Sequence, residues 1–341
     1  MKVGFIAPLS IVAVNGGVRT QAHQTAKNLK NQGVEVDFIS PWQDSLDVDL
    51  VHIFTASPET LGIIKRCSEI GIKTVLSPVF FSTRPAKDIS LKLKLERTAS
   101  KLGSGISSEY GIKAQICNLA DKVVPNTQEE ADLIIQAFDV SAKKVHVVPN
   151  GVEERFKDSS PDLFIKEYGL KEFVLFAGHA GAQRKNVIKL LERAKDIPEP
   201  VVIIGSFYDD DYGASCKKLA QTSNVTLIET QEHDSELLAS AYAACNTFIL
   251  PSLFETPGIA AMEAALAKAN IVITRYGGTK EYFGDLAEYI DPQSSESIVK
   301  GINKSLTKPE SSNLRDHILQ HYTWSRVAEL TAEVYNTVSK F

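Results

Sequence analysis

Short apolar runs alternate with helix-forming segments along almost the whole chain, and no other feature constrains the fold as strongly. In the first part of the chain these runs are residues 2–7, 34–40, 50–54, 73–76, 122–124 and 145–148. Helical patterns lie between them at residues 18–32, 59–70 and 127–138. Apolar strands separated by helices are typical of a parallel sheet that is covered on both faces. We therefore predict an α/β fold with a doubly wound sheet.

A second block with the same alternation begins after a turn at Val148-Pro149-Asn150-Gly151 and a polar segment, residues 153–161, that looks like a linker. The strands predicted beyond it are residues 173–177, 201–205, 225–228, 247–250, 271–274 and 287–290. The helices predicted between them are residues 185–194, 214–221, 235–244, 259–266 and 296–306. A chain of 341 residues is long enough for two cores. We predict two successive doubly wound domains.

The charge balance and the cysteines limit the kinds of partner and compartment. The chain has 37 basic and 42 acidic residues and a net charge of −5, which argues against nucleic acid as a partner. Four widely spaced cysteines without a CxxC pair are typical of reduced thiols in a cytoplasmic protein, and not of a disulfide or zinc framework. These cysteines are Cys67, Cys117, Cys216 and Cys245.

The start of the chain has two interpretations. Lys2 followed by the apolar residues 3–14 resembles a short signal sequence. Pro8 and Ser10 interrupt that run, and a glycine pair and a helical pattern follow directly, so we favour a first strand. No apolar run reaches the length of about 20 residues that spans a bilayer. Any membrane contact is therefore expected to be peripheral.

Residues 250–264, LPSLFETPGIAAMEA, carry two carboxylates at positions suited to a ligand site. An apolar strand ends at Pro251, a loop carries Glu255, and the helix that follows carries Glu263. A loop after a parallel strand lies at the carboxyl edge of the sheet, where open α/β proteins bind ligands, and the amides of the next helix attract anions. Taken alone, the two glutamates also fit a hydrolase that uses them as acid and nucleophile.

Candidate anion ligands follow the first strand of each block. After the first strand of the chain they are Gly16 and Gly17, and after the first strand of the second block they are His179, Arg184 and Lys185. A glycine loop between a strand and a helix suits a phosphate, although Gly-Gly alone is also an ordinary turn. Both sets are predicted at the carboxyl edges of their sheets.

No metal site is expected. The chain has no Asp-x-Asp motif, and the acidic run Asp209-Asp210-Asp211 is more typical of a solvated loop than of metal ligands. Without a metal, a diphosphate leaving group needs stabilisation by positive side chains. Arg184 and Lys185 are placed to supply it.

The predicted helix at residues 89–102 interrupts the alternation of strands and helices. It places Ile89 and Leu93 near one face, and Leu91 and Leu95 near another. It is either a helix docked on the core with its lysines in solvent, or a basic apolar surface for an anionic acceptor or lipid headgroups. The basic residues of the second interpretation are Arg84, Lys87, Lys92 and Lys94.

The segment FETPGIAAMEAALA resembles the E-x7-E element of the GT-B glycosyltransferases, specifically of the retaining family 4, with Glu255 and Glu263 as its two glutamates. Six further segments agree with that family in order and spacing. They are NGGVRTQAHQTAKNLKNQGVEVDFI, ADKVVPNTQEEADLI, VHVVPNGVEERF, FVLFAGHAGAQRKN, ILPSLFE and ITRYGGTKEYFGDLAEYIDP. Each motif is modest alone, but their common order is specific, and the resemblance covers essentially the whole chain.

The resemblance implies a GT-B fold, in which two Rossmann-like domains face a central cleft and the last helix crosses back to the first domain. The acceptor-side domain would be residues 1–152 plus 323–341, and the donor-binding domain residues 153–322. The implied activity is that of a metal-independent retaining glycosyltransferase without a cofactor. Its donor would be a UDP- or GDP-sugar, and its acceptor a glycan, a lipid-linked molecule or a small molecule.

The resemblance also assigns roles to matching positions. In the family, the position of Glu263 holds the ribose hydroxyls of the donor, and the position of Glu255 lies at the sugar. The position of Lys185 binds the diphosphate, which makes Glu255 and Lys185 the catalytic candidates. The remaining donor-binding positions are Gly16, Gly17, His179, Arg184, Pro257, Gly258 and Ile259.

Four positions depart from the family pattern. His179 stands where the family usually has arginine. Histidine is positively charged only when it is protonated, whereas arginine always carries its charge. Arg184 is a candidate substitute for the missing arginine. Pro257 replaces a common aromatic residue, and Glu229 stands at the usual glycine of the base-binding loop. The first-domain histidine that many members place near the sugar should fall around Ser77 and is absent.

These departures leave two alternatives open. One is a non-catalytic GT-B homologue that acts as an acceptor-binding or partner-stabilising subunit, and the other is a nucleotide-sugar epimerase. The main expectation remains a cytoplasmic enzyme of glycan or cell-envelope polysaccharide assembly. Contact with the inner face of the membrane and assembly into a homo-oligomer are further expectations.

Overall fold

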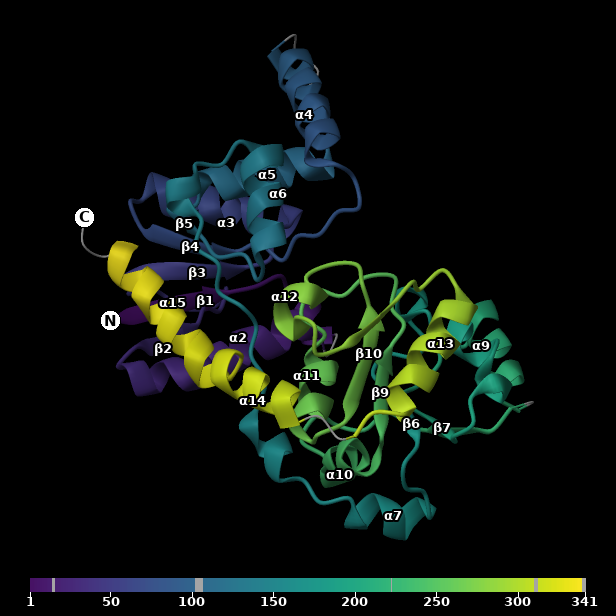
Figure 1. The fold of residues 1–341 in the computed structure, drawn as a ribbon. Coiled ribbons are helices and arrows are strands. Elements are labelled where there is room, and N and C mark those ends of the chain that lie inside the picture. The colour runs from purple at the N-terminus through teal and green to yellow at the C-terminus, as the bar shows by residue number, and fades with distance from the viewer. Residues whose placement is uncertain (14–15, 102–106, 222, 310–311, 339–341) are drawn as a thin grey trace. The chain divides into compact units, whose positions relative to one another are not determined.

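The chain forms two compact units. The computed structural model describes residues 1–13, 16–101, 107–221, 223–309 and 312–338. Unit 1 comprises Met1–Gly151 and Trp324–Phe341, and unit 2 comprises Val152–Thr323. Each unit is an α/β structure on a parallel sheet, which confirms the predicted fold class (Figure 1). The unit bounds differ by one residue from the domain bounds predicted above.

Unit 1 is built on a five-stranded sheet in the order β2-β1-β3-β4-β5, with all pairings parallel. Its strands are β1 (Lys2–Ile6), β2 (Glu35–Phe38), β3 (Leu50–Phe54), β4 (Lys73–Ser77) and β5 (Lys122–Val123). The strand predicted at residues 145–148 is wrong, since Val145 forms only an isolated bridge with Val123. Because β5 has only two residues, its edge is too short for a longer strand to pair with it.

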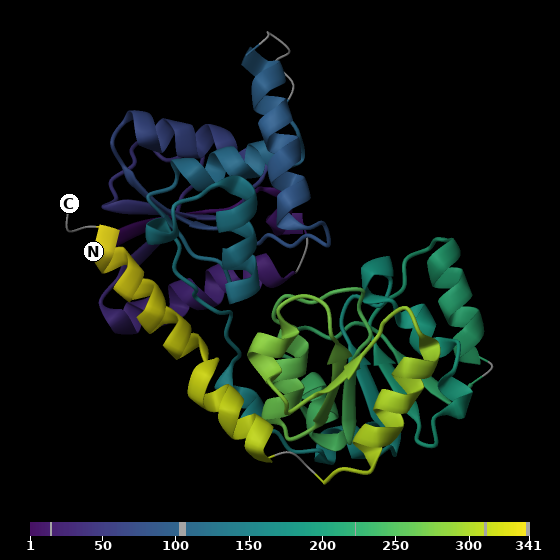
Figure 2. The same cartoon turned by 45° about the horizontal axis from the view of Figure 1, so that its top comes forward.

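Helices cover both faces of this sheet (Figures 1 and 2). Side chains alternate along a strand, so β3 buries Val51 and Ile53 on one face, and His52 and Phe54 on the other. The first face shares its core with α3, α5 and α6. The second face is covered by α2 and α15, which pack together. These helices are α2 (Gly17–Leu29), α3 (Pro58–Glu69), α5 (Glu109–Leu119), α6 (Gln128–Phe138) and α15 (Trp324–Val338).

A buried histidine joins α15 to the sheet of unit 1. Nδ1 of His52 lies 2.6 Å from the hydroxyl oxygen of Tyr335, and its Nε2 lies 2.9 Å from Oγ of Ser77. Burial lowers the pKa of His52 to about 3, so the ring is neutral and donates from only one nitrogen. The prediction that the last helix returns to the first domain is confirmed.

The helix α4 (Ala86–Lys101) is docked along one side only. Ile89 and Leu93 are buried, whereas Leu91 and Leu95 are 60% and 65% exposed. The helix packs on α6 and α5, and in both views it projects beyond the other helices of unit 1 (Figures 1 and 2). Residue 102, the predicted end of this helix, lies outside the described residues. Among the described helices, none combines the length and apolar character needed to cross a bilayer.

Unit 2 contains a six-stranded parallel sheet in the order β11-β10-β9-β6-β7-β8. Its strands are β6 (Val174–Ala177), β7 (Val201–Ile204), β8 (Val225–Ile228), β9 (Thr247–Leu250), β10 (Asn270–Thr274) and β11 (Glu288–Ile290). After β6 the chain builds the sheet outwards through β7 and β8, and then continues on the other side with β9. The carboxyl ends of β6 and β9 therefore form a topological switch point, where doubly wound folds bind ligands.

Helices lie in two layers around the sheet of unit 2 (Figure 1). One layer contains α10 (Glu236–Ala244), α11 (Ile259–Leu266) and α14 (Ser312–His321), and the other contains α8 (Val187–Leu191), α9 (Asp211–Gln221) and α13 (Ser295–Leu306). The expectation of a polar linker at residues 153–161 is wrong in part. Residues Glu154–Asp158 form a short 3₁₀ helix, η3, and Phe156 is fully buried in the core of unit 2.

Candidate active site

The switch point of unit 2 brings together the two residues predicted to be catalytic. Lys185 follows β6 and Glu255 follows β9, and these two strands pair directly. Nζ of Lys185 lies 2.6 Å from Oε1 of Glu255. The hydroxyl of Ser252 donates to the same carboxylate oxygen at 2.6 Å. The ion pair is therefore built from two loops at adjacent carboxyl ends.

The electrostatics of this pair keep the carboxylate ionised. The side chain of Glu255 is 7% exposed and that of Lys185 is 17% exposed. Burial alone raises the pKa of the Glu255 carboxyl, but the positive charges of Lys185 and Arg184 lower it below its ordinary value. An ionised Glu255 cannot act as a general acid, which counts against the hydrolase interpretation. An ammonium group has three donors, so the contact with Glu255 leaves two for phosphate oxygens.

Arg184 borders the ion pair and links the two loops. Its guanidinium donates to the carbonyl oxygen of Phe254 at 2.8 Å and lies 3.6 Å from Oε1 of Glu255. The backbone N–H of Leu253 donates to the carbonyl oxygen of Arg184 at 2.9 Å. Because the side chain of Arg184 is 42% exposed, its charge remains accessible to an anion.

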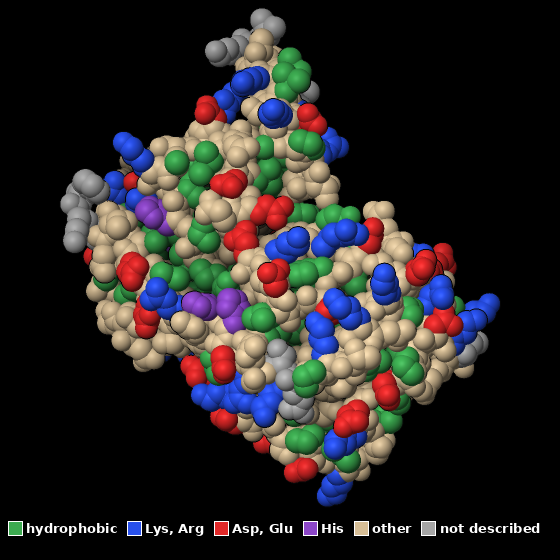
Figure 3. Space-filling view, in the orientation of Figure 1, with side chains coloured by type: hydrophobic (Ala, Val, Ile, Leu, Met, Phe, Trp, Pro, Cys, Tyr) green, Lys and Arg blue, Asp and Glu red, His purple; other side chains and the backbone are tan. Residues whose placement is uncertain are grey.

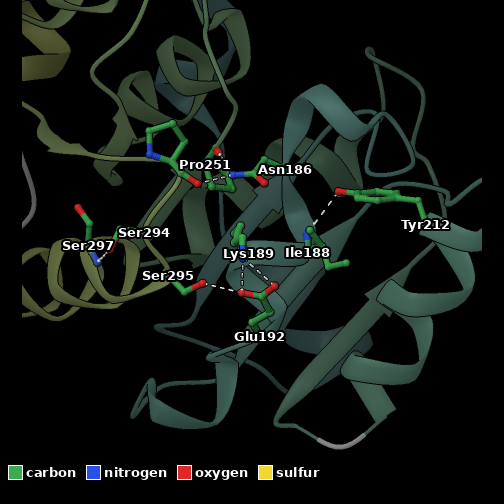
Figure 4. A network of polar contacts seen from close by, with 10 residues as sticks. Asn186, Ile188, Lys189, Glu192, Tyr212, Pro251, Ser294, Ser295 and Ser297 are labelled. Carbon is green, nitrogen blue, oxygen red and sulfur yellow. Dashed lines mark hydrogen bonds and ion pairs between the residues drawn. The ribbon is translucent and has the colours of Figure 1, made fainter.

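Asn186 fixes the backbone directly after Lys185. Its φ is +57°, in the left-handed region. Its side-chain amide donates to the carbonyl oxygens of Pro251 at 3.0 Å and Pro292 at 2.7 Å, and Figure 4 shows it beside Pro251. The helix predicted at residues 185–194 therefore begins only after Asn186, where the N–H of Ile188 donates to the hydroxyl of Tyr212 (Figure 4). Lys185 belongs to the loop and not to that helix.

The turn after β10 holds the backbone of Glu255. The N–H of Glu255 donates to the carbonyl oxygen of Tyr276 at 3.1 Å. The next residue, Gly277, has φ +90°, and a Cβ atom at this position would overlap the carbonyl oxygen of Glu255. Only glycine allows this approach, so Gly277 supports the loop that carries Glu255.

The loop predicted to surround the sugar opens the helix α11. Gly258 is its N-cap with φ +71°, and the half-buried Pro257 and Ile259 flank it. The N–H of Ala261 bonds to the carbonyl oxygen of Gly258 at 2.8 Å, so the helix begins tightly. The first amides of a helix carry partial positive charge and bind anions. In α11 they lie at the carboxyl edge of the sheet, after β9.

Glu263 is buried on α11, and two side chains contact its carboxylate. The hydroxyl of Tyr242 donates to Oε2 at 3.0 Å, and Nε2 of His233 lies 2.8 Å from Oε1. Burial and the charge of Glu263 raise the pKa of Tyr242 well above its ordinary value, so this phenol remains a donor. Neither partner could be predicted from the sequence, since His233 and Tyr242 lie outside the segments that resemble the family and carry no spacing signal.

The other predicted site residues lie apart from these contacts. His179 is exposed after β6, and its carbonyl oxygen accepts the N–H of Ala182 at 3.0 Å. Gly16 caps α2 in an extended conformation and Gly17 opens that helix, both in unit 1. Their contacts with a diphosphate stay predictions, as does the acceptor role of the exposed basic residues Arg84, Lys87, Lys92 and Lys94.

Among the described residues, no group of three or more His, Cys, Asp or Glu side chains is arranged to hold a metal ion. The four cysteines are free thiols, each buried in a core. Burial raises the pKa of the Cys117 and Cys245 thiols, which are therefore poor nucleophiles. The charged side chains that meet at the switch point of unit 2 are those of Lys185, Arg184 and Glu255.

Two family models match consecutive parts of the chain. The model described as "Glycosyltransferase Family 4" matches residues 42–156. The model described as "Glycosyl transferases group 1" matches residues 161–319, which include Lys185, Glu255 and Glu263.

Among curated proteins, the chain is 22% identical over 269 residues to alpha-maltose-1-phosphate synthase of Mycolicibacterium smegmatis, covering 71% of this chain and 69% of that protein. It is 25% identical over 264 residues to D-inositol 3-phosphate glycosyltransferase 1 of Catenulispora acidiphila, covering 69% of this chain and 62% of that protein. The second match spans less than two thirds of the length of that relative.

Solved structures share the fold over nearly the whole chain. A sucrose-phosphate synthase from Thermosynechococcus elongatus has a TM-score of 0.76 at 16% identity, with 98% of each chain covered. Anabaena Alr3699/HepE, solved in complex with UDP-glucose, has a TM-score of 0.73 at 16% identity, with 99% of this chain and 100% of that chain covered. At this level of identity the likeness concerns the fold alone.

Proposed function

We propose that this chain, a glycosyltransferase of the GT-B fold made of a family 4 segment and a group 1 segment, moves a sugar from a nucleotide diphosphate sugar to an acceptor hydroxyl. The transfer would retain the anomeric configuration and need no metal ion. The contact between Lys185 and Glu255 at the switch point of unit 2 is the observation that carries this proposal. A fixed ammonium group beside a helix N-terminus suits a departing diphosphate.

In the proposed mechanism, Lys185 and the first amides of α11 neutralise the diphosphate as the bond between the sugar C1 and the phosphate oxygen breaks. Glu255 holds Lys185 in place and contacts the sugar, while Glu263 holds the ribose. The departing phosphate oxygen takes the proton of the acceptor hydroxyl. The acceptor oxygen then forms the new bond to C1 on the face that the phosphate has left.

We also propose the chemical classes of the donor and of the acceptor. UDP-glucose in a structure of the same fold supports a UDP-sugar, and a GDP-sugar remains the other donor considered. The names of the relatives support a phosphorylated small-molecule acceptor beside the glycan and lipid-linked classes. We propose a cytoplasmic site of action in glycan or cell-envelope polysaccharide assembly.

A thermal-shift screen of UDP- and GDP-sugars tests the proposed function. A donor at a hundred times its Kd should stabilise the folded protein by about 2.7 kcal/mol and raise its Tm. Incubation of that donor with sugar-phosphate acceptors, followed by NMR of the products, should show a new glycosidic bond. Consumption of the donor without an acceptor would instead indicate an epimerase, and the absence of any stabilising donor would indicate a non-catalytic homologue.

We also propose that the exposed side of α4 contacts an anionic membrane. Leu91 and Leu95 form its apolar centre, and Lys87, Lys94 and Lys92 flank that centre at helical spacing. Figure 3 shows basic and hydrophobic side chains gathered over this helix. Each lysine near an anionic surface contributes about 1 kcal/mol.

Replacing both leucines of α4 by serine should therefore reduce the fraction of protein that floats with anionic phosphatidylglycerol vesicles by about tenfold. Leu163, which is 40% exposed on α7 (Asp162–Tyr168), provides a matched control, and its replacement by serine should change nothing. Equal flotation of the double variant and the wild type would contradict the proposed membrane contact.

A further inference from the structure

His233 lies between two carboxylates of unit 2. Its Nε2 is 2.8 Å from Oε1 of Glu263, and its Nδ1 is 3.4 Å from Oε2 of Glu153. The two carboxylates come from different parts of the chain, Glu263 from α11 and Glu153 from the segment before η3. The imidazole is the side chain that joins them.

The position of this histidine is fixed from several elements. The guanidinium of Arg155 donates to the backbone carbonyl oxygen of His233. The ring of Phe156 meets the imidazole edge-on, with the centroids 5.9 Å apart. The charged or titratable groups that face His233 are therefore Glu263 from α11, and Glu153 and Arg155 from the segment that contains η3. Tyr242 of α10 reaches the same cluster through Glu263.

The hydrogen-bond capacity of Glu263 matches a ribose. An ionised carboxylate accepts at about four lone-pair sites, two on each oxygen. Tyr242 occupies one site on Oε2 and His233 occupies one site on Oε1. One acceptor site then remains on each oxygen. Two vicinal hydroxyls fit that arrangement, provided that the carboxylate is held in this orientation.

We propose that His233 is a positioning residue that orients the Glu263 carboxylate for the two ribose hydroxyls of the donor, so that donor affinity depends on the protonation of His233. This inference rests on the function proposed above. A protonated imidazole donates to both carboxylates at once. A neutral imidazole has one N–H, so it loses the hydrogen bond to Glu263 or to Glu153 and turns a lone pair towards that oxygen.

The surroundings favour the charged form of the ring. The hydrogen bond with Glu263 raises the pKa of His233, and the charges of Glu263 and Glu153 act in the same direction. Burial and the charge of Arg155 oppose this effect, but the pKa stays above the ordinary value of 6.5. The bridging form is therefore complete in mildly acidic solution and is lost as the pH rises through the pKa of the folded protein.

Calorimetric titration with UDP and with GDP tests this inference. At pH 6.5, replacing His233 by alanine should weaken binding of the nucleotide by about tenfold, which corresponds to one hydrogen bond to a charged group. The ratio of the two Kd values should shrink as the pH rises through the raised pKa of His233, because the wild-type ring then loses its charge. The variant His233→Gln supplies an N–H that does not titrate, so it should recover part of the affinity and abolish the pH dependence.

If His233 acts through Glu263, its effect on nucleotide affinity must depend on the ribose hydroxyls. The alanine variant and the wild type should therefore bind the 2′,3′-dideoxy form of the nucleotide with equal affinity. His321, an exposed histidine on α14, gives the matched control, and His321→Ala should bind like the wild type at every pH.

The outcomes separate this inference from the proposed function. If the wild type binds neither UDP nor GDP, the proposed function fails and the inference falls with it. If the wild type binds a nucleotide but the Kd ratio is constant from pH 6.5 to 9, or is the same for the dideoxy form, the inference alone is overturned. A merely structural role of His233 would lower the Tm without either of these dependences.

Discussion

Replacing Lys185 by alanine should lower kcat/KM for the donor by about a thousandfold, because in the proposed mechanism the departing diphosphate loses a fixed positive charge. The same change leaves Glu255 buried with Ser252 and the more distant Arg184 as its partners. Removing one member of a buried ion pair costs about 3–5 kcal/mol. We therefore expect a lower Tm of the free protein together with a loss of nucleotide affinity.

The matched control for this prediction is Lys189→Ala. Lys189 lies four residues further on, in α8, and pairs with Glu192 at 2.9 Å at the surface, where both side chains are 36% exposed. An exposed pair of this kind contributes less than about 1 kcal/mol. Initial rates and calorimetry of the two variants distinguish an effect specific to Lys185 from the general effect of removing a lysine nearby. Unchanged nucleotide affinity in Lys185→Ala would show that the diphosphate binds elsewhere.

The variant Gly277→Ala should lower kcat by about a hundredfold, although residue 277 contributes no side-chain chemistry. The added Cβ atom would overlap the carbonyl oxygen of Glu255, so the loop that carries the carboxylate must shift. A displacement of about 1 Å at a catalytic group costs rate on this scale. Overpacking and the positive φ together should lower the free energy of unfolding by about 2–5 kcal/mol.

A variant of a second glycine separates the steric overlap of the added Cβ atom from the cost of the positive φ. Gly169 ends α7 with φ +67°, and no atom lies within 4 Å of the position of an added Cβ. Gly169→Ala therefore carries the backbone cost of about 1–2 kcal/mol without a clash. Urea unfolding and steady-state rates of both variants make the comparison. If the two glycine variants lose equal activity, the loss in Gly277→Ala does not come from displacement of the loop that carries Glu255.

Most of the strands and their order in the chain could be predicted because they are short apolar runs, and the central ones are buried on both faces. Val174–Ala177 and Thr247–Leu250 are fully buried in this way. The run at residues 145–148 is equally apolar, but strand formation also needs a partner edge, and β5 is too short to provide one. The partner edge is a property of the sheet and cannot be read from the run itself.

Only those residues of the candidate site that lie in a segment resembling the family could be predicted from the sequence. Lys185 and Glu255 stand after strands that the apolar pattern identifies, so their meeting at one edge follows from the topology. His233 and Tyr242 meet Glu263 through the path of a loop and the packing of α10, which no spacing encodes. The role of Gly277 depends on a backbone approach that appears only in three dimensions.

The return of α15 to unit 1 has a consequence for how the protein is made. The sheet of unit 1 is complete once residue 123 has been synthesised, but the helix that supplies Tyr335 to His52 follows the whole of unit 2 in the chain. During vectorial synthesis domains tend to fold as they emerge. Unit 2 can therefore fold before the last helix is made, while the part of the unit 1 sheet that α15 covers, including His52, is still exposed.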